Sequence, residues 1–297
     1  MTENVTAVEW YPADGSAKVT FTRSWPFKLR DIQGIDATLA QVLSRKNPSQ
    51  TGATAVDVEV GVRVVPIQLQ VAAETEEGLW ALRRQLVRAL VASPARPGES
   101  VALGTLRLLR GDLPAIELRA VPRNSPQGSK SKGIPLYEAD LEFEAPYPYW
   151  RDTVDQSVNF AQTDGGFEFE LEFPLEMVGN NVEQEVDNMG DVDAPIRVQL
   201  HGDCTVARFI NVTTGETLEV SGQIEAGDYI EVTTGYGEKD VVLVESDGTR
   251  SSAMARLNLD LADFWSLRPG LNTIRFEADT NVSGTARLFW RQRYAGA

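Results

Sequence analysis

The sequence contains a single histidine and a single cysteine, and both lie in the segment His201-Gly202-Asp203-Cys204. An imidazole beside a thiol can activate the sulfur as a nucleophile. If the two residues share a strand, however, side chains three positions apart point to opposite faces. The spacing therefore favours an inert, buried Cys204 over a catalytic pair. The sequence also lacks a phosphate-binding glycine loop and the common hydrolase motifs, so we predict no catalytic residue and no enzymatic activity.

The acidic segment Glu183–Asp193 is the strongest candidate for a metal site, because Ca²⁺ binds carboxylate oxygens. Its spacing does not fit the calcium-binding loop D-x-[DN]-x-[DN]-G. We therefore expect a solvated acidic loop, and no metal or cofactor. A carboxylate pair for glycoside hydrolysis stays open, since the sequence does not say which two acids would face each other.

Three aromatic residues are candidates for sugar contacts, namely Trp265, Trp290 and Tyr236. An exposed ring of this kind presents an apolar face together with a polar atom. Aromatic residues on alternating strands, however, usually belong to the core. A carbohydrate-binding module is therefore the alternative function. It requires that these three rings be exposed to solvent.

The predicted strands and helix that would position these candidate residues fall into two groups, which are separated by the stretch Leu141–Trp150. Its first half alternates apolar residues with glutamates, which is typical of a strand with one buried face. Pro146 and Pro148 then prevent the ladder from continuing. We read this stretch as the last strand of one domain, over residues 1–152, and the hinge into a second domain, over residues 153–297.

Charge divides the chain at the same place. Residues 1–150 carry 17 basic and 17 acidic residues, whereas residues 151–297 carry 11 and 26 and so hold the whole net charge of −15. An acidic protein lacks the cations that neutralise phosphates, so we expect no sequence-specific nucleic-acid binding. We also expect no membrane insertion and no signal peptide, because no apolar run is long enough and the N-terminus has no basic start. One cysteine excludes an internal disulfide.

The first half predicts strands and one main helix. A strand is expected at Val19–Phe21, and a strand pair or one long bent strand at Val56–Val71, with Pro66 at an edge or bulge. The helix is expected over Glu76–Val91, capped by Thr75, with leucines at three- and four-residue spacing forming one apolar stripe.

A hairpin over Thr105–Val121 is expected to follow the helix. The segment Arg123–Gly133 has no apolar residue and predicts a mobile loop or arm, with Arg123, Lys130 and Lys132 as its cations.

The second half predicts an almost purely β domain. Glycine turns separate its expected strands, which lie at Phe167–Phe173, Ile196–Leu200, Glu216–Val220, Tyr229–Thr233, Val241–Val244, Ala255–Leu261, Thr273–Ala278 and Ala286–Trp290. Strands at this spacing indicate a β-sandwich or jelly roll. The predicted fold class is therefore mostly β, with an N-terminal β-sandwich-type domain that holds one main α-helix.

Several segments together resemble the siphophage distal tail protein (Dit) family. The matching stretches, beyond the leucine-striped helix, are A-D-L-E-F-E-A-P-Y-P-Y-W at 139–150, N-M-G-D-V-D-A-P-I at 188–196, I-N-V-T-T-G-E-T-L at 210–218, L-R-P-G-L-N-T-I-R-F at 267–276 and W-R-Q-R-Y at 290–294. Gly215 suits a tight hairpin turn, and Pro269-Gly270 a type II turn. These are roles in the scaffold.

The resemblance implies a structural virion protein of the phage tail tip, or baseplate, assembled in the host cytoplasm. It implies an N-terminal belt domain that forms a hexameric ring and a C-terminal galectin-like domain outside it. The implied partners are the tail tube protein, the tail-tip hub or tail-associated protein, a receptor-binding protein and, in the alternative reading, a cell-surface glycan for host adsorption. A ring needs a heterologous interface that closes, for which the Arg123–Gly133 segment or the 105–121 hairpin is the expected arm.

Overall fold

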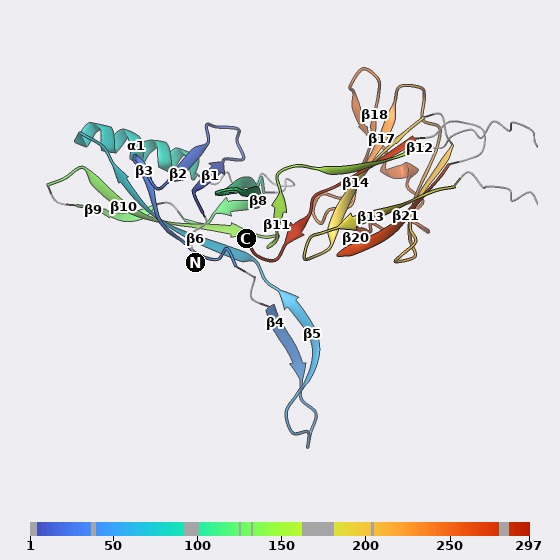
Figure 1. Cartoon of the computed structure of the whole chain (residues 1–297), viewed down its shortest axis with the longest axis horizontal. Helices are drawn as coiled ribbons and strands as arrows, with labels where there is room; N and C mark the ends of the chain where they lie inside the picture. The colour runs from blue at the N-terminus through green and yellow to red at the C-terminus, as the bar shows by residue number, and fades with distance from the viewer. Residues whose placement is uncertain are drawn as a thin grey trace, which may run out of the picture. The chain divides into compact units, whose positions relative to one another are not determined.

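A computed structural model of the chain describes residues 5–36, 40–91, 101–124, 126–131, 133–161, 181–202, 205–278 and 285–297. The chain folds into two compact units (Figure 1). The first unit comprises Met1–Thr153 together with Tyr294–Ala297, and the second comprises Val154–Arg293. Each unit has a hydrophobic core of its own.

The first unit is built on one ten-stranded sheet. Its strands are β1 (Ala7–Tyr11), β2 (Val19–Thr22), β3 (Phe27–Ile32), β6 (Arg63–Ala72), β7 (Gly104–Arg110), β8 (Leu113–Pro122), β9 (Gln127–Lys130), β10 (Leu136–Ala145), β11 (Trp150–Asp152) and β23 (Arg293–Tyr294). Their spatial order is β23-β11-β8-β7-β1-β2-β3-β6-β10-β9. Because β8 also pairs with β10, the run of strands between them closes on itself as a barrel.

The alternating residues of β10 and β6 fill the barrel. Leu141 pairs with Ile67 and Phe143 with Val65 across the two strands, and all four side chains are buried. The alternation predicted for the stretch before the hinge is therefore confirmed.

β6 is an inner strand between β3 and β10, but its pairing with β3 ends at Ile67, so Pro66 has a strand partner only in β10 and occupies the predicted edge position on the other side. Its carbonyl accepts a hydrogen bond from the Gln33 amide at 3.0 Å. The N–H and C=O of one residue in an antiparallel strand point to the same side. The missing N–H of Pro66 therefore faces the side where β3 has already ended at Ile32, and the ladder with β10 loses nothing.

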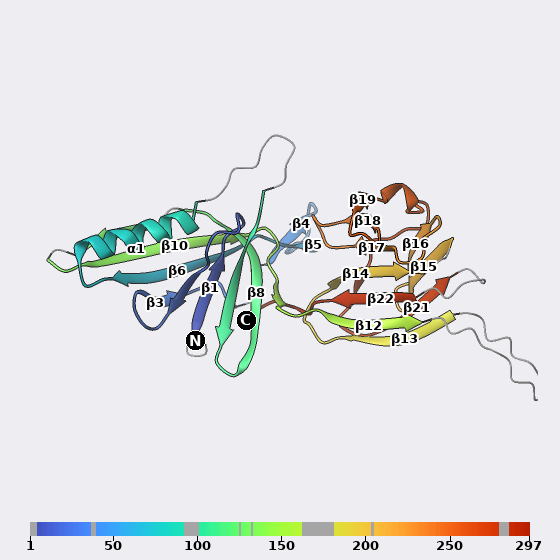
Figure 2. The ribbon, with the colours of Figure 1, turned by 90° about the horizontal axis from the view of Figure 1, so that it is seen from above.

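The predicted helix is confirmed as α1 (Glu76–Ala89). Its N-cap is Thr75, whose hydroxyl accepts a hydrogen bond from the Gly78 amide at 3.1 Å. Leu79 and Leu86 are buried in the core of the unit. The helix lies along β6 and β10 (Figure 2).

A separate two-stranded hairpin projects from the first unit (Figure 1). It consists of β4 (Ala40–Arg45) and β5 (Thr54–Val60), which pair with each other. Its tip is the polar loop between these strands, and Gly61-Val62 separates β5 from β6. Val56–Val71 thus contains two strands, but they do not form the predicted pair, because β5 pairs with β4 and β6 lies between β3 and β10 in the ten-stranded sheet.

A buried cation joins the root of this hairpin to the barrel. The guanidinium of Arg63, a residue only 2% exposed, donates to the carbonyls of Gly34 at 2.6 Å and Asp36 at 2.5 Å, just before β4. It also donates to the carbonyls of Pro148 and Ala295, both at 2.5 Å. Burial lowers the pKa of this guanidinium, because a charged group loses its hydration there.

The second unit is a sandwich of two sheets. One sheet has the order β12-β22-β14-β17-β18-β19, with β20 paired to β14, and the other has the order β13-β21-β15-β16. The strands are β12 (Gln156–Ala161), β13 (Asn181–Asn188), β14 (Ala194–His201), β15 (Val206–Asn211), β16 (Glu216–Ser221), β17 (Tyr229–Thr233), β18 (Asp240–Val244), β19 (Arg250–Ser252), β20 (Ser266–Leu267), β21 (Gly270–Ala278) and β22 (Thr285–Trp290). Aromatic rings from both sheets meet in its core, with Phe160 and Phe209 centred 5.0 Å apart. The predicted fold class, mostly β with one main helix, is confirmed for the described residues.

Buried asparagines fix the turns of the second unit. Asn272, 1% exposed, donates to the carbonyls of Arg268 and Gly270 at 2.8 Å each and accepts from the Arg268 amide at 3.0 Å. Asn188, also 1% exposed, likewise bonds to the carbonyls of Val192 and Leu267. Gly215 and Gly270 have φ values of 79° and 89°, as the predicted turns require.

Three segments differ from their predictions. Glu183–Asp193 is not an acidic loop throughout, because its first part lies in β13, where exposed acids alternate with inward residues such as the buried Val186. Ala255–Leu261 is not a strand: Met254–Arg256 form the short helix η1, and Asn258 then opens a turn by accepting from the Leu261 and Asp260 amides. The strand predicted at Phe167–Phe173 lies outside the described residues.

Replacing Arg63 with methionine tests the carbonyl cluster around its guanidinium. The Arg63→Met variant leaves buried carbonyls without a donor, so we expect the first unit to lose about 3 kcal/mol or more of unfolding free energy. Hydrogen exchange during urea unfolding, which reports each unit separately, measures this loss. The exposed Arg45→Met is the matched control and should change stability by about 0.5 kcal/mol at most. Equal stability of the two variants would contradict this role of Arg63.

Candidate interaction surfaces

The projecting hairpin has one apolar face that is exposed. Residues directly opposite in an antiparallel pair share a face, and Val42 pairs with Val58 and Ala40 with Val60. Val56 is also exposed, but it lies at the register shift between Asp57 and Ala55, where the alternation of faces is interrupted. We call Ala40, Val42, Val58 and Val60 the valine face; its three valines are between 43% and 57% exposed. The alternation in the sequence predicts these strands but not that their apolar side is uncovered.

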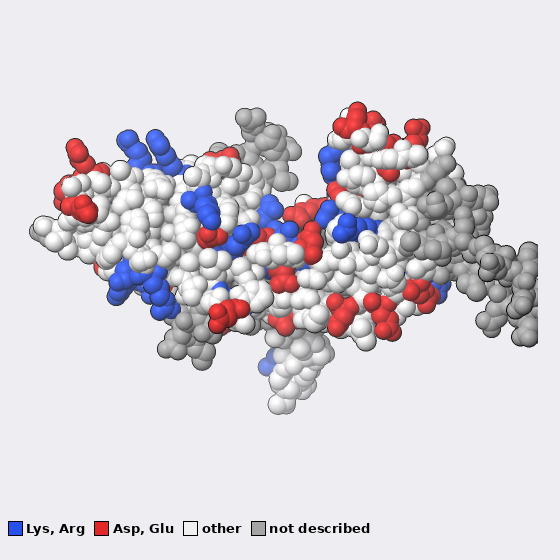
Figure 3. All heavy atoms as spheres, turned by 45° about the horizontal axis from the view of Figure 1, so that its top comes forward, with Lys and Arg blue, Asp and Glu red and all other residues white. Residues whose placement is uncertain are grey.

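The opposite face of the hairpin is polar. It carries Gln41, Asp57 and Glu59, together with Leu43. In Figure 3 the hairpin is a largely uncharged protrusion on the side in view. The hairpin is therefore an amphipathic two-stranded sheet.

The helix α1 also carries an uncovered apolar stripe. Trp80 and Val87, seven residues apart, lie on one side of the helix, and Val91 follows on the same side just beyond its end. Trp80 is 57% and Val91 65% exposed. We call these three residues the helix stripe; it is distinct from the buried leucines and its spacing is visible in the sequence.

Arginines flank the helix stripe. The Arg83 guanidinium lies 5.2 Å from the centre of the Trp80 ring and 4.8 Å from that of Tyr137. Arg84 and Arg88 are exposed on the same helix. The stripe thus combines two valines with a tryptophan and arginines, and the last two residue types are enriched at protein interfaces.

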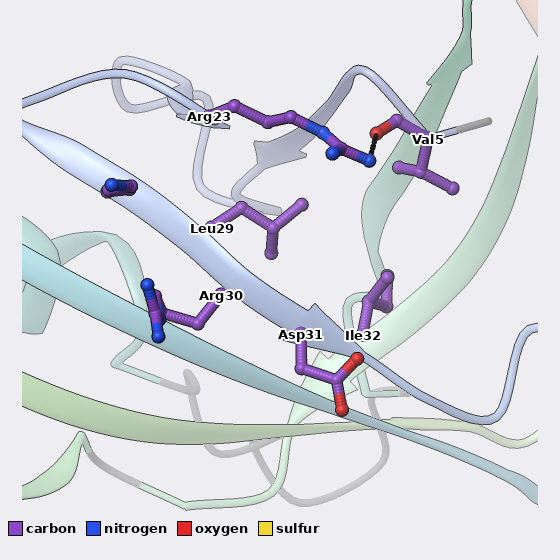
Figure 4. Close-up of a pocket in the computed structure, with 7 residues that line it drawn as sticks. Val5, Arg23, Leu29, Arg30, Asp31 and Ile32 are labelled. Carbon is purple, nitrogen blue, oxygen red and sulfur yellow. Dashed lines mark hydrogen bonds between the residues drawn. The ribbon is translucent and has the colours of Figure 1, made fainter. Parts of the chain in front are cut away.

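A hollow beside β3 gathers three cations (Figure 4). Its lining includes Arg23, Lys28 and Arg30, with Asp31 as the acidic residue. Arg23 donates to the Val5 carbonyl at 3.4 Å, and Asp31 accepts from Gln33 at 2.9 Å. This lining can attract an anionic group, but it offers no nucleophile paired with a base.

The three predicted sugar contacts have very different environments. Trp265 is 1% exposed and stacks on Phe209 in the core of the second unit, with ring centres 6.0 Å apart. Trp290 is partly buried and packs against the same core. Tyr236 is 83% exposed. Burial prevents Trp265 from stacking on a sugar, so the three residues do not form one exposed platform.

The predicted arm of cations is partly folded onto the first unit. The expected mobile loop is wrong for Gln127–Lys130, which form β9 on the edge of β10. Lys130 forms an ion pair with Glu76, and the Arg123 guanidinium lies 3.6 Å from the Glu144 carboxylate. Lys132 lies outside the described residues. A ring contact through these residues stays a prediction.

The remaining chemical candidates give no constellation in the described part of the chain. His201 lies against Tyr229, and burial, with the charge of Arg287, lowers its pKa. Cys204 is outside the described residues. Among the residues described, no three His, Cys, Asp or Glu side chains gather as metal ligands. The described helices include none with the length and apolarity needed to cross a membrane.

An ion-pair network covers part of the larger sheet of the second unit. Arg197 lies between Asp155, at 2.8 Å, and Glu231, at 3.2 Å, and Arg250 reaches Glu231 at 2.7 Å. Burial opposes ionisation of Glu231, but hydrogen bonds from Gln199 and the two arginines outweigh it and lower its pKa. Burial likewise opposes ionisation of Asp155, but hydrogen bonds and charges from Arg291 and Arg197 outweigh it and lower the pKa of this carboxyl group.

Comparison with known proteins agrees with this architecture. Residues 189–294 match the family of siphovirus-type tail components, in their C-terminal domain. No curated protein sequence matches the chain. The fold is similar to that of the Dit protein of phage SPP1, described as a paradigm of the hub adsorption apparatus in phages that infect Gram-positive bacteria. That match has 13% identity and a TM-score of 0.64 and covers 96% of this chain and 99% of the other.

The fold is also similar to that of a chain in the activated baseplate of phage P2 with Ca. The identity is 10% and the TM-score 0.56, over 96% of this chain and 97% of the other. At such identities the likeness establishes the fold. Together with the family match, it confirms the resemblance to siphophage distal tail proteins that the sequence motifs indicate.

Substitution of Trp265 distinguishes a core residue from a sugar contact. Trp265→Ala removes a fully buried ring, so we expect the second unit to lose about 3–5 kcal/mol. Tyr236→Ala removes an exposed ring and should cost about 0.5 kcal/mol or less. Urea unfolding measures both. A Trp265→Ala variant as stable as Tyr236→Ala would show that the ring is not part of the core.

The ion-pair network predicts acid sensitivity. Because the pKa of Glu231 is lowered on folding, its stabilisation is present above the unfolded pKa, about 4.3, and is lost as the pH falls through the folded value. The urea concentration at which the second unit is half unfolded should therefore decrease as the pH is lowered below about 5. Glu231→Gln should be less stable at pH 7 and lose less on acidification, whereas the exposed Glu225→Gln should follow the unmodified protein. An unchanged slope in Glu231→Gln would contradict this account.

Proposed function

We propose that this chain, which carries the C-terminal domain of the siphovirus-type tail components, forms a ring at the tip of a long phage tail. The first unit closes the ring, and the ring joins the tail tube to the tail-tip hub. The family match over residues 189–294 is the observation that carries the proposal, and the likeness of fold extends over both units.

The distribution of charge supports this arrangement. The sequence up to residue 150 is neutral, whereas residues 151–297 hold the entire net charge of −15. A neutral unit can pack against copies of itself, but strongly acidic units repel one another. The second unit therefore suits the periphery of the ring, where it would carry receptor-binding or other peripheral proteins.

The role is structural and the location is the virion, with assembly in the host cytoplasm. The residues that the motifs single out, such as Asn188, Asn272 and Gly215, fix turns by hydrogen bonds or backbone conformation. Such residues build a scaffold and do not need a cofactor.

A glycan contact by the second unit is the second candidate. The observation in its favour is Tyr236, whose ring is 83% exposed. Stacking on a single ring would give weak binding, which a glycan array with Tyr236→Ala as control can detect. Equal signals from both proteins would exclude this residue as the contact.

Light scattering of the purified protein, with negative-stain images of the same peak, tests the ring. We expect a closed ring whose mass is a multiple of 32.6 kDa, with six copies as the number implied by the resemblance. A protein that stays a single chain at every concentration, with no rings in the images, would contradict closure by this chain.

A further inference from the structure

The chain leaves the first unit once and later returns to it. It leaves after Thr153, builds the second unit over Val154–Arg293, and comes back with Tyr294–Ala297, which belong to the first unit. Figure 1 marks the C-terminal end of the chain beside the strands of the first unit. We call Tyr294–Ala297 the strap. Synthesis runs from the N-terminus, so the strap can contact the first unit only after the whole second unit has been made.

The strap is bonded to the first unit at both of its ends. Tyr294 lies in β23, at the edge of the ten-stranded sheet beside β11. Its hydroxyl donates to the Asp152 carboxylate at 3.1 Å, and its side chain packs against the core of the unit. The Ala297 amide donates to the carbonyl of Ile35 at 2.8 Å. The strap thus completes one edge of the sheet and reaches the segment that leads to the projecting hairpin.

The middle of the strap supplies an acceptor to the buried guanidinium. The carbonyl of Ala295 accepts a hydrogen bond from Arg63 at 2.5 Å. The other three carbonyls described above as acceptors of this guanidinium come from the sequence before residue 150. A buried charged donor that loses an acceptor costs more than a neutral one. The root of the hairpin, which the same guanidinium holds, therefore depends in part on the strap.

The second unit holds the residue directly before the strap. The carbonyl of Arg293 accepts from the Asp191 amide at 2.8 Å. A Cβ atom added at Gly190 would lie 2.5 Å from that carbonyl oxygen and 2.8 Å from the Arg293 nitrogen. Glycine allows the returning chain to pass this closely. Both residues belong to the stretch N-M-G-D-V-D-A-P-I, so this motif fixes the point from which the strap begins.

An ion pair inside the second unit holds the outgoing and returning chains together. Asp155 lies just after the chain enters this unit, and Arg291 lies just before it leaves. The Nε atom of Arg291 is 2.5 Å from the Asp155 carboxylate. A strap whose starting point is already held there closes only a short loop when it docks beside β11. If the second unit were unfolded, docking would close a loop as long as that unit, at a larger cost in entropy.

We infer that the strap couples the two units, so that the first unit reaches its full stability only when the second unit is folded. The folded second unit fixes Arg293, and the strap then completes the sheet edge and the acceptors of Arg63. The coupling is reciprocal, because a strap bound by the first unit stabilises the second unit by the same factor. The inference goes beyond the proposed ring and holds whether or not the chain forms one.

Hydrogen exchange measured on peptic peptides tests the coupling, because it follows β6 and β10 separately from the second unit. Three proteins are compared with the unmodified chain: Gly190→Ala, which displaces Arg293, a chain that ends at Arg293, and the shortened chain with Gly190→Ala. The control is Gly227→Ala, at a turn of the second unit with a φ of 95°, where an added Cβ meets Ser246. This control weakens the second unit without touching Arg293.

We expect exchange in β6 and β10 to become about tenfold faster in Gly190→Ala and in the shortened chain, because Arg63 loses an acceptor in both. In the shortened chain, Gly190→Ala should add nothing, since the segment that it displaces is absent. Gly227→Ala should speed exchange in the second unit and leave β6 and β10 unchanged. If Gly190→Ala does not fold, Arg291→Gln removes the ion pair with Asp155 and should speed exchange in β6 and β10 by about threefold.

Three results would overturn the inference. Unchanged exchange in the shortened chain would show that the strap does not stabilise the first unit. An equal effect of Gly190→Ala with and without the strap would show that the influence takes another route. An effect of Gly227→Ala on β6 and β10 as large as that of Gly190→Ala would remove the role of Arg293. All three leave the proposed ring standing, and a chain that forms no ring leaves the coupling standing.

Discussion

The first unit depends on a buried positive charge that must be satisfied. An unpaired charge in the interior is very costly, so the guanidinium of Arg63 holds its acceptors firmly. Those acceptors come from segments far apart in the sequence: Gly34 and Asp36 before the hairpin, Pro148 after the last barrel strand, and Ala295 near the C-terminus. These are the places where the chain leaves the barrel. One side chain therefore fixes both the root of the hairpin and the exit from the barrel at Pro148.

In the second unit, neutral side chains fix the turns of the chain by buried hydrogen bonds. Buried asparagine side chains carry both a donor and an acceptor and can replace backbone partners at turns. Asn188 and Asn272 do so where β13 ends and β21 begins. In the motifs that resemble the distal tail family, the polar side chains of these asparagines therefore form hydrogen bonds that stabilise the fold. What remains for interaction is surface, namely the acidic exterior of the second unit and the two apolar faces of the first.

Sequence periodicity predicts most of this fold and little of its surface. The alternation of apolar residues and glutamates predicted β10, and the spacing of the leucines predicted α1. β9 was not predictable because an edge strand of exposed polar residues leaves no hydrophobic signal, and the ladder offered by β10 decides it. Near Leu259 the alternation misleads, since the Asn258 turn leaves that leucine 75% exposed. The Arg63 contacts join residues up to 232 positions apart, and the uncovered state of the valine face depends on tertiary structure, so no local pattern reveals either.

Native mass spectrometry of the unmodified chain tests most directly the central claim that this chain closes a ring. We expect one dominant assembly whose mass is a fixed multiple of 32.6 kDa, because a heterologous contact that closes ends at a defined copy number. Assemblies that grow without a fixed end, or a single chain at every concentration, would contradict the account.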